Sequence, residues 1–156
     1  MTTTARIPAQ IPQISRILVA TDFSVQARNA LEWAQSLAGA FEAKLVLLHV
    51  IDIFSLAEMG CVMEGGTDPL PLVREQAHRC MGELKTLLPN AEAVVREASP
   101  RPTIVAAARE LSCQLIVMGT HGRSGLAHLL LGSVAEYVVR NSTVPVLTVR
   151  LHEKQT

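Results

Sequence analysis

One stretch, from Leu115 to Arg150, constrains the fold more than any other part of this chain. It begins with the apolar run Leu-Ile-Val-Met, which is typical of a strand that a parallel sheet buries on both faces. Glycines follow at once, a helical pattern opens at Gly132-Ser133, and a β-branched strand over residues 144–149 closes the stretch. This order of strand, glycine loop, helix and strand predicts a β-α-β unit.

The glycines of this stretch suggest a use beyond turning the chain. Glycine adopts positive φ freely and lets a ligand approach the backbone, and a loop in such conformations can point successive N–H groups inward around an anion. A helix that starts at Gly132-Ser133 adds free N–H groups, the positive end of its dipole and the Ser133 hydroxyl. We therefore favour a phosphate-binding loop over the simpler interpretation, in which the glycines only turn the chain between strand and helix.

The rest of the chain continues the alternation of strands and helices. Further strands are predicted at residues 17–20, 45–50 and 91–95, and helices after Ser24, from about 71 to 88 and from about 101 to 112. This pattern predicts an α/β fold: a single doubly wound domain over residues 15–151, with a five-stranded parallel sheet and helices on both faces. Residues 1–14 are expected to form a flexible leader and residues 152–156 a tail. Residues 51–70 are expected to be a long connection, either a lid or a disordered segment.

Composition and charge exclude several classes of function. The 156 residues suffice for one α/β domain, and the aromatic content of 3% predicts an aliphatic core. A formal net charge of +0 and few aromatic residues leave no basic field and no stacking platform, so a nucleic-acid partner is rejected. No apolar run approaches the roughly 18 residues of a membrane span. Three cysteines without a CxxC spacing indicate a cytoplasmic protein rather than a disulfide framework.

The glycine spacing resembles that of a known family. Gly119-x-x-Gly122, then nine residues, then Gly132-Ser133 is similar to the nucleotide-binding signature of the universal stress protein family. Residues 16–24 resemble that family's first strand with its aspartate, and residues 44–52 its second strand, so the resemblance covers residues 16–150. It implies the strand order 3-2-1-4-5. Asp22 and Gly119 would then meet where the order reverses, which is where open α/β sheets bind ligands.

The resemblance also implies a set of nucleotide-binding residues for ATP, with Mg²⁺ as a companion of the phosphates. Phosphates and ribose would lie on the glycines and Ser133, and the adenine would meet the backbone of Val50. The whole set is Ala20, Thr21, Asp22, Val50, Gly119, His121, Gly122, Arg123, Ser124, Gly125, Gly132, Ser133 and Val134. Three positions depart from the family pattern: Ala20 replaces proline or valine, Ala98 a glycine, and Gln114 an aspartate.

Several members of this set have a second interpretation. Arg123 either contacts a phosphate or is a solvated loop arginine, and His121 either donates to a phosphate or caps the loop. Asp22 can bond the nucleotide or a loop N–H, or it can cap the following helix, and these roles are compatible. His49, at the end of the second strand, is expected to be packed and hydrogen-bonded rather than catalytic.

Binding does not imply catalysis here. The chain lacks the G-x-x-x-x-G-K-[ST] motif, and its lysines, Lys44, Lys85 and Lys154, lie far from the glycine loop in sequence. No catalytic residue is predicted. We expect ATP binding with very slow hydrolysis at most, as in a nucleotide-dependent stress regulator with unknown protein partners. The alternatives are a dimeric adaptor of the same fold that binds no nucleotide, and a weak ATPase or adenylyl-transfer enzyme.

Two groups of residues could form metal sites, but the sequence favours neither. Met59-x-Cys61-x-Met63 offers soft sulfur ligands for copper(I), but a mobile apolar flap is favoured because no second ligand cluster accompanies it. His121 and His128 are seven residues apart across the glycine loop, without an accompanying cysteine or carboxylate cluster. No metal-binding residue is therefore predicted.

The last strand suggests a partner. Residues 144–149 are apolar on both faces, and the implied strand order places them at a sheet edge. An exposed apolar edge strand invites pairing with another chain, and the resemblance implies dimerisation through this strand. We expect a homodimer that pairs through Val144–Val149.

Overall fold

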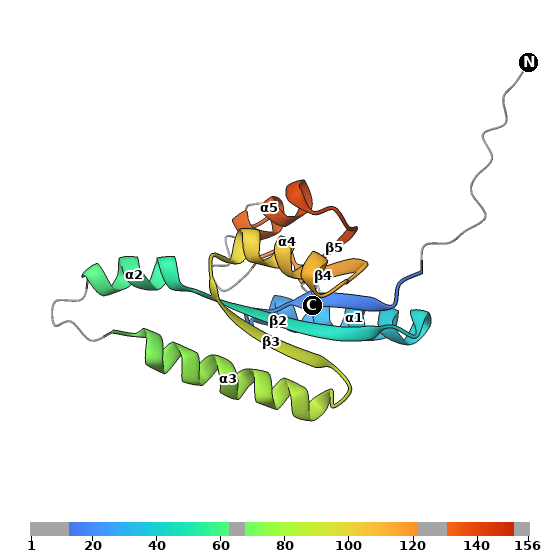
Figure 1. Ribbon diagram of the computed structural model, residues 1–156, viewed down its shortest axis with the longest axis horizontal. Coiled ribbons are helices and arrows are strands. Elements are labelled where there is room, and N and C mark those ends of the chain that lie inside the picture. Colours follow the sequence, from blue (N-terminus) through green and yellow to red (C-terminus); the bar gives the residue numbers. More distant parts are fainter. Residues whose placement is uncertain (1–12, 63–67, 122–130, 152–156) are drawn as a thin grey trace, which may run out of the picture.

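The computed structural model describes residues 13–62, 68–121 and 131–151. It contains one sheet of five parallel strands in the order β3-β2-β1-β4-β5 (Figure 1), which confirms the predicted fold class and strand order. The strands are β1 (Arg16–Ala20), β2 (Lys44–Asp52), β3 (Glu92–Ala98), β4 (Leu115–Gly119) and β5 (Val146–Val149).

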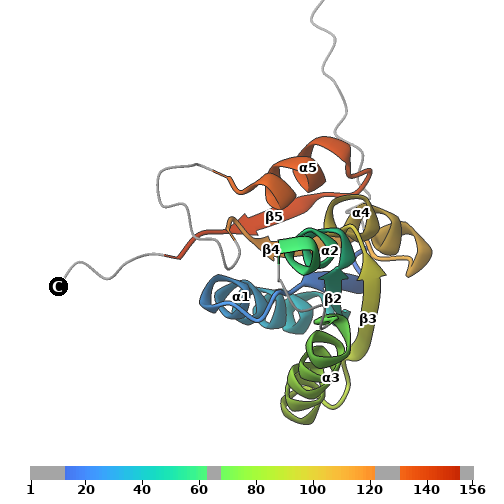
Figure 2. The same cartoon turned by 90° about the vertical axis from the view of Figure 1, so that its left-hand side faces the viewer.

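Helices cover both faces of the sheet. They are α1 (Val25–Phe41), α2 (Ile53–Val62), α3 (Leu70–Leu87), α4 (Pro100–Glu110) and α5 (Ser133–Asn141). Figure 2 shows α1 and α3 on one side of the sheet and α4 and α5 on the other. This division gives the molecule two aliphatic cores, one between each helix pair and the sheet.

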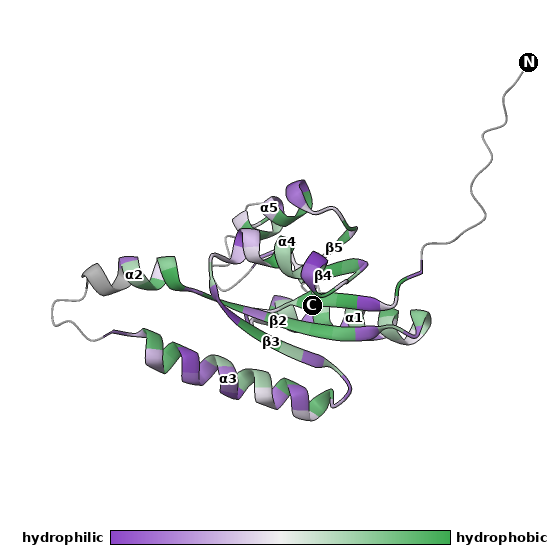
Figure 3. Cartoon of the chain, viewed as in Figure 1, coloured by the Kyte–Doolittle hydropathy of each residue, from purple (hydrophilic) through white to green (hydrophobic). Residues whose placement is uncertain are grey.

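The three central strands form the floor of both cores. Side chains of β1, β2 and β4 alternate between the two faces: Leu18 and Ile116 pack toward α4 and α5, whereas Ile17 and Val117 pack toward α1 and α3. All four are fully buried. Figure 3 shows these strands as largely hydrophobic, and the low aromatic content predicted this aliphatic packing.

Helix α1 sits close to the sheet because its buried stripe consists mostly of alanine. Ser24 is the N-cap, and its side chain accepts a hydrogen bond from the Ala27 N–H at 3.2 Å. Ala27, Ala30, Leu31 and Ala34 are buried, as the periodicity predicted. Trp33 lies off this stripe with 55% of its surface exposed.

The prediction for residues 51–70 was wrong in one respect, because ten of these residues form α2. Asp52 starts the helix: its Oδ1 accepts hydrogen bonds from the N–H groups of Phe54 and Ser55, and its Oδ2 accepts one from the Ser55 hydroxyl. An aspartate before an apolar segment is a helix-start signal, and the sequence interpretation overlooked it. Figure 1 shows α2 extending from the carboxyl end of β2, away from the sheet.

The bounds of the two edge strands also differ from the predicted ones. β5 begins at Val146 rather than residue 144, because Ser142 folds back on Val144: the Ser142 hydroxyl donates to the Val144 C=O and accepts from its N–H. β3 extends to Ala98 rather than residue 95 and begins at Glu92. The longer β3 pairs with β2 as far as Asp52↔Ala98.

The turn before β4 shows how one departure from the family pattern is accommodated. The side-chain Oε1 of Gln114 accepts hydrogen bonds from the N–H groups of Ser15 and Arg16, each at 2.9 Å, and from the Ser15 hydroxyl at 3.0 Å. A glutamine therefore ties the start of β1 to the start of β4.

Candidate functional site

The predicted site lies where the strand order reverses, between β1 and β4. These strands pair from Ile17↔Leu115 to Ala20↔Met118, so Thr21 and the residues after it begin beside Gly119. β2 flanks β1 on its other side, whereas β5 flanks β4. The carboxyl ends of all four strands lie at the same edge of the sheet, which is the usual ligand side of an open α/β fold.

The end of β4 is joined directly to the start of α5. The Thr120 N–H donates to the Val149 C=O at 3.1 Å, and the Thr120 C=O accepts from the Gly132 N–H at 2.7 Å. Thr120 is only 5% exposed. These two bonds hold Gly132 and the first turn of α5 beside the carboxyl end of β4, although Thr120 and Gly132 are far apart in sequence.

The two described glycines of the motif are required by close packing, not by a left-handed backbone. A Cβ at Gly132 would lie 3.1 Å from the Thr120 carbonyl oxygen, and a Cβ at Gly119 would lie 3.1 Å from Cβ of Gln26 in α1. Gly132 has a φ of −71°, and neither glycine has a positive φ. Close packing within the chain therefore favours glycine at these two positions, and the approach of a ligand to the glycine loop stays a prediction.

Helix α5 presents an uncapped N-terminus to this crevice. Gly132 is its N-cap and has no side chain, and among the described residues no side chain caps the N–H groups of Ser133, Val134 and Ala135. Ser133 is exposed, whereas Ala135 and Val138 are buried and anchor the helix. Free N–H groups and the positive end of the dipole suit a phosphate or another anion.

His121 adds a buried polar atom beside the same helix start. Its Nδ1 lies 3.1 Å from the Thr120 hydroxyl. Its Nε2 is buried, and no described residue forms a hydrogen bond with it. Buried polar atoms in folded proteins nearly always have a partner, so this nitrogen is suited to a polar group of a bound ligand. A Cβ at Gly132 would lie 3.8 Å from Cδ2 of the His121 ring.

The turn after β1 lies on the other side of the crevice from the start of α5. Thr21 Oγ1 accepts from the Phe23 N–H at 3.0 Å, and Asp22 Oδ1 accepts from the Ser24 N–H at 3.0 Å. Phe23 has a φ of 65°, in the left-handed region that non-glycine residues seldom adopt. Asp22 therefore bonds a loop N–H beside the helix, while Ser24 is the N-cap of α1.

The remaining predicted residues divide into two groups. Ala20 is buried at the end of β1, and Val50 is half-buried near the end of β2, both at the carboxyl edge. Gly122, Arg123, Ser124 and Gly125 lie outside the described residues. The structure thus brings Ala20, Thr21, Asp22, Val50, Gly119, His121, Gly132, Ser133 and Val134 to one edge of the sheet.

Neither metal site that the sequence raised can be built from the described residues. His128 and Met63 lie outside them, as do the side chains of Met59 and Cys61. Across residues 13–62, 68–121 and 131–151, no group of three or more histidine, cysteine, aspartate or glutamate side chains could hold a metal ion.

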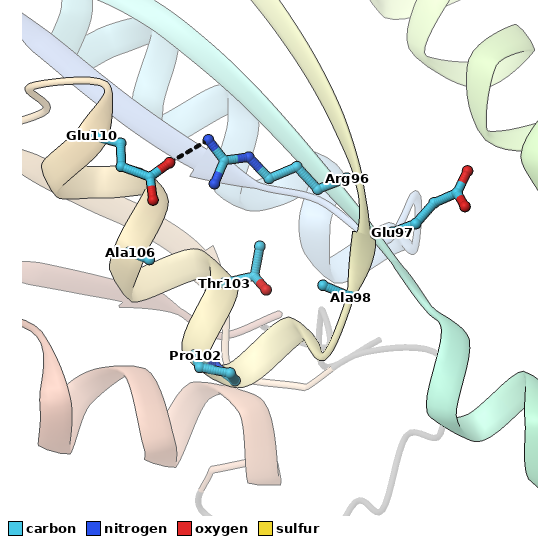
Figure 4. A pocket seen from close by; sticks show the side chains of 7 residues that line it. All are labelled: Arg96, Glu97, Ala98, Pro102, Thr103, Ala106 and Glu110. Atoms are coloured by element: carbon cyan, nitrogen blue, oxygen red, sulfur yellow. Dashed lines mark ion pairs between the residues drawn. The ribbon is translucent and has the colours of Figure 1, made fainter.

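A cleft of about 470 Å³, whose lining shares no residue with the predicted site, lies between β3 and α4 (Figure 4). Arg96 of β3 reaches across it and pairs with Glu110 of α4 at 2.6 Å. Ala98, Pro102, Thr103 and Ala106 line the rest. Sequence reasoning singled out only Ala98 among these residues, as a departure from the family pattern, because their meeting depends on the longer β3. The two charges that span the cleft neutralise each other, so this geometry favours a structural role.

In the parts of the chain that are described, no helix combines the length and apolar character needed to cross a membrane.

Comparison with known proteins identifies the family. The profile of the universal stress protein family matches residues 13–150. The chain belongs to this family. This universal stress protein is 31% identical over 145 residues to universal stress protein MJ0531 of Methanocaldococcus jannaschii, which covers 90% of this chain and 84% of the relative. It is 33% identical over 152 residues to MJ0577 of the same organism, covering 86% and 94% of the two chains.

Solved structures agree with this assignment. The structure of MJ0577 superposes with a TM-score of 0.80 at 30% identity and covers 92% of this chain and all of its own, 100%. A universal stress protein solved in complex with cAMP superposes with a TM-score of 0.57 at 28% identity, covering 88% of this chain and 98% of that one.

Proposed function

We propose that this universal stress protein binds ATP in the crevice between β1 and β4 and acts as a nucleotide-dependent regulator in the cytoplasm, with very slow hydrolysis at most. One observation carries the proposal. The 2.7 Å bond from the Gly132 N–H to the Thr120 C=O sets the start of α5 beside the buried Nε2 of His121, with which no described residue forms a hydrogen bond. Free backbone donors beside a buried polar ring form an environment suited to a phosphate chain.

The residues present fit a nucleotide at this position. The N–H groups of Ser133 and Val134, with the Ser133 hydroxyl, would hold phosphate oxygens, and the backbone of Val50 would meet the base. The cAMP complex of a relative with 28% identity supports the adenine nucleotide class. Mg²⁺, where it accompanies the phosphates, would neutralise part of their charge.

The first test is the nucleotide content of the purified protein. The protein would be denatured and its supernatant separated by chromatography, beside a Ser133→Asp variant. A carboxylate at the first position of α5 is compatible with the helix dipole, so the variant should fold. It would repel phosphates, so ATP should be found with the wild type and be at least about tenfold depleted in the variant.

A matched variant controls for added charge. Ser36 is exposed on α1, within a helix, and Ser36→Asp should retain its ATP. Ser133→Asp with wild-type ATP content would show that the start of α5 is not the phosphate site. No nucleotide in the wild type, and no binding of added ATP and magnesium, would leave the dimeric adaptor as the function. Steady ADP or AMP production well above background would favour an enzyme.

We further propose that the protein is a homodimer formed through β5. Backbone groups of Pro145 and Val149 point toward β4, since their carbonyls accept from Ile116 and Thr120. Val146 and Thr148 therefore direct their N–H and C=O groups outward. The next outward groups along the chain are occupied: the Ser142 hydroxyl bonds Val144, and the Asn29 side chain donates to the Arg150 C=O at 3.2 Å.

Antiparallel pairing about a two-fold axis satisfies this short edge. Val146 would exchange both of its backbone hydrogen bonds with Thr148 of the partner subunit, and symmetry would repeat the exchange, with the axis at Leu147. All outward groups of β5 would then be paired. Sedimentation should detect dimers at micromolar concentration, and a monomer alone would contradict the proposal.

A further inference from the structure

The ladder between β1 and β2 stops before β2 does. The two strands pair from Arg16↔Lys44 to Ala20↔Leu48, and the final rung is the Thr21 N–H donating to the Leu48 C=O at 2.9 Å. β2 continues to Asp52 and remains paired with β3 over this length. The last residues of β2 therefore have a strand on one side only.

A side chain takes the place of the next rung. In a continued parallel ladder, the Thr21 C=O would accept from the Val50 N–H. Instead, this carbonyl lies 2.8 Å from Nδ1 of His49. A carbonyl only accepts hydrogen bonds, so Nδ1 carries the proton in this contact. His49 is 8% exposed, and its ring packs against Phe23 with centroids 4.4 Å apart and the ring planes tilted by 33°, which restricts the orientation of the imidazole.

Because His49 bonds the Thr21 carbonyl, the Val50 backbone groups face the ligand side of the sheet without a partner strand. The N–H and C=O groups of Leu48 point toward β1. Because these directions alternate along a strand, the N–H and C=O groups of Val50 point to the same side. β1 has ended there, so the Val50 N–H and C=O point past Thr21 into the crevice. Within the described part of the chain, no other backbone group replaces the missing rung at Val50.

We propose that His49 is a positioning residue of the nucleotide site: by occupying the Thr21 carbonyl, it keeps the Val50 N–H and C=O available to read the edge of an adenine base. The inference rests on the proposed nucleotide binding. His49 does not touch the ligand in this account. It acts through Thr21 and Val50.

The two backbone groups of Val50 select for adenine by their polarity. An N–H donor and a C=O acceptor on one residue match the N1 acceptor and the N6 amino donor of adenine. Guanine presents a donor at N1 and an acceptor at O6, so both contacts become mismatched. A site that leaves backbone groups unpaired with the wrong ligand discriminates strongly against it. The wild type should prefer ATP to GTP.

The test compares binding of ATP and GTP by calorimetry in wild type, His49→Leu and His49→Asn. Leucine removes the donor, so the Val50 N–H can close the ladder onto Thr21 and must be released before a base binds. ATP affinity should fall about 3- to 10-fold, and the preference for ATP over GTP should shrink with it. The amide nitrogen of asparagine lies where Nδ1 lies in histidine, so His49→Asn should restore both quantities.

Hydrogen exchange of backbone amides in the nucleotide-free protein, followed by NMR, provides a second measurement. A purely structural role of His49 would not change the exchange rate at Val50. The Val50 N–H should exchange quickly in the wild type and in His49→Asn, and become protected in His49→Leu. Adding ATP should protect it in the wild type. His78→Leu, at an exposed histidine of α3, is the matched control and should change neither exchange at Val50 nor affinity.

The outcomes distinguish the role of His49 from the proposed nucleotide binding on which it rests. If the wild type binds no nucleotide, the proposed function fails. If the wild type prefers ATP while folded His49→Leu keeps the same affinity, the same preference and a fast Val50 amide, nucleotide binding stands and the role of His49 is refuted.

Discussion

The two edges of the sheet are built in opposite ways. β3 carries charges that are paired on both faces of the sheet: Arg96 with Glu110 of α4, and Glu97 with Arg74 of α3. β5 has the sequence Val-Leu-Thr-Val and contains no charge. Charged side chains on an edge strand discourage pairing with another chain, and an uncharged edge permits it. These differences are consistent with the dimer proposed above, which pairs through β5 rather than β3.

The lengths of β3 and β5 add to the difference between the two edges. β3 pairs over seven residues with β2, so the N–H and C=O groups of Ala93, Val95 and Glu97 point outward by alternation. β5 directs those of Val146 and Thr148 outward, and its ends are occupied within the chain. The longer edge would be the greater aggregation hazard without its ion pairs. The shorter one limits pairing to a single register.

Matched proline substitutions in β5 and β3 should give the largest effect on dimerisation. They test directly which edge of the sheet pairs. Thr148→Pro removes an outward N–H from β5, where the bonds to β4 come from neighbouring residues. Each dimer would lose two hydrogen bonds, so its dissociation constant should rise at least about tenfold. Ala93→Pro removes an outward N–H from β3 and should leave the dimer intact. Sedimentation velocity over a concentration series would decide, and a dimer lost only in Ala93→Pro would reverse the assignment of the edges.

Removing the charges of β3 should produce a smaller change of the opposite kind. In a double variant, Arg96→Val with Glu97→Thr, the outward backbone would lose both flanking ion pairs. Exposed ion pairs contribute only about 0–1 kcal/mol, so the thermal midpoint should move little. Light scattering should nevertheless detect species larger than the wild-type assembly. Unchanged scattering up to high concentration would show that the charges do not protect this edge.

Acid should have the mildest effect on the same edge. Hydrogen bonding to the Arg74 guanidinium lowers the pKa of Glu97 below its usual range. The stabilisation is present above the pKa of an unfolded glutamate, about 4.3, and is lost as pH falls through the lower folded value. Denaturation followed from pH 6 downward should show this decline, and Glu97→Gln should flatten it. An identical pH profile in the variant would show that Glu97 does not contribute to the loss of stability in acid.

The sequence predicted much of the architecture because the relevant signals are local. Apolar runs defined β1, β2 and β4, and the alanine stripe defined the packed face of α1. Strand order came from the family resemblance, since periodicity contains no information about which strands are neighbours. The segment at α2 was misjudged because the sequence interpretation considered the length of the connection and overlooked the capping by Asp52.

The candidate site was predictable in its residues but not in its contacts. Spacing singled out Gly119, Gly132 and Ser133, yet the reason that the two glycines are needed lies in Gln26 and the Thr120 carbonyl. Those contacts arise only when α1 and α5 are packed. His49 was expected to be hydrogen-bonded, and it is. That its partner is the carbonyl of a neighbouring strand depends on where β1 ends.

The bond between the Gly132 N–H and the Thr120 C=O has a consequence for insertions and deletions. It fixes both ends of the intervening segment at the carboxyl edge of the sheet. The entropy of closing a loop grows only with the logarithm of its length, by about 0.6 kcal/mol for each doubling. A change in the number of residues between Thr120 and Gly132 should therefore alter the free energy of unfolding only slightly, as long as this hydrogen bond is kept. The contact between Thr120 and Gly132, rather than the length of chain between them, keeps α5 in register with the sheet.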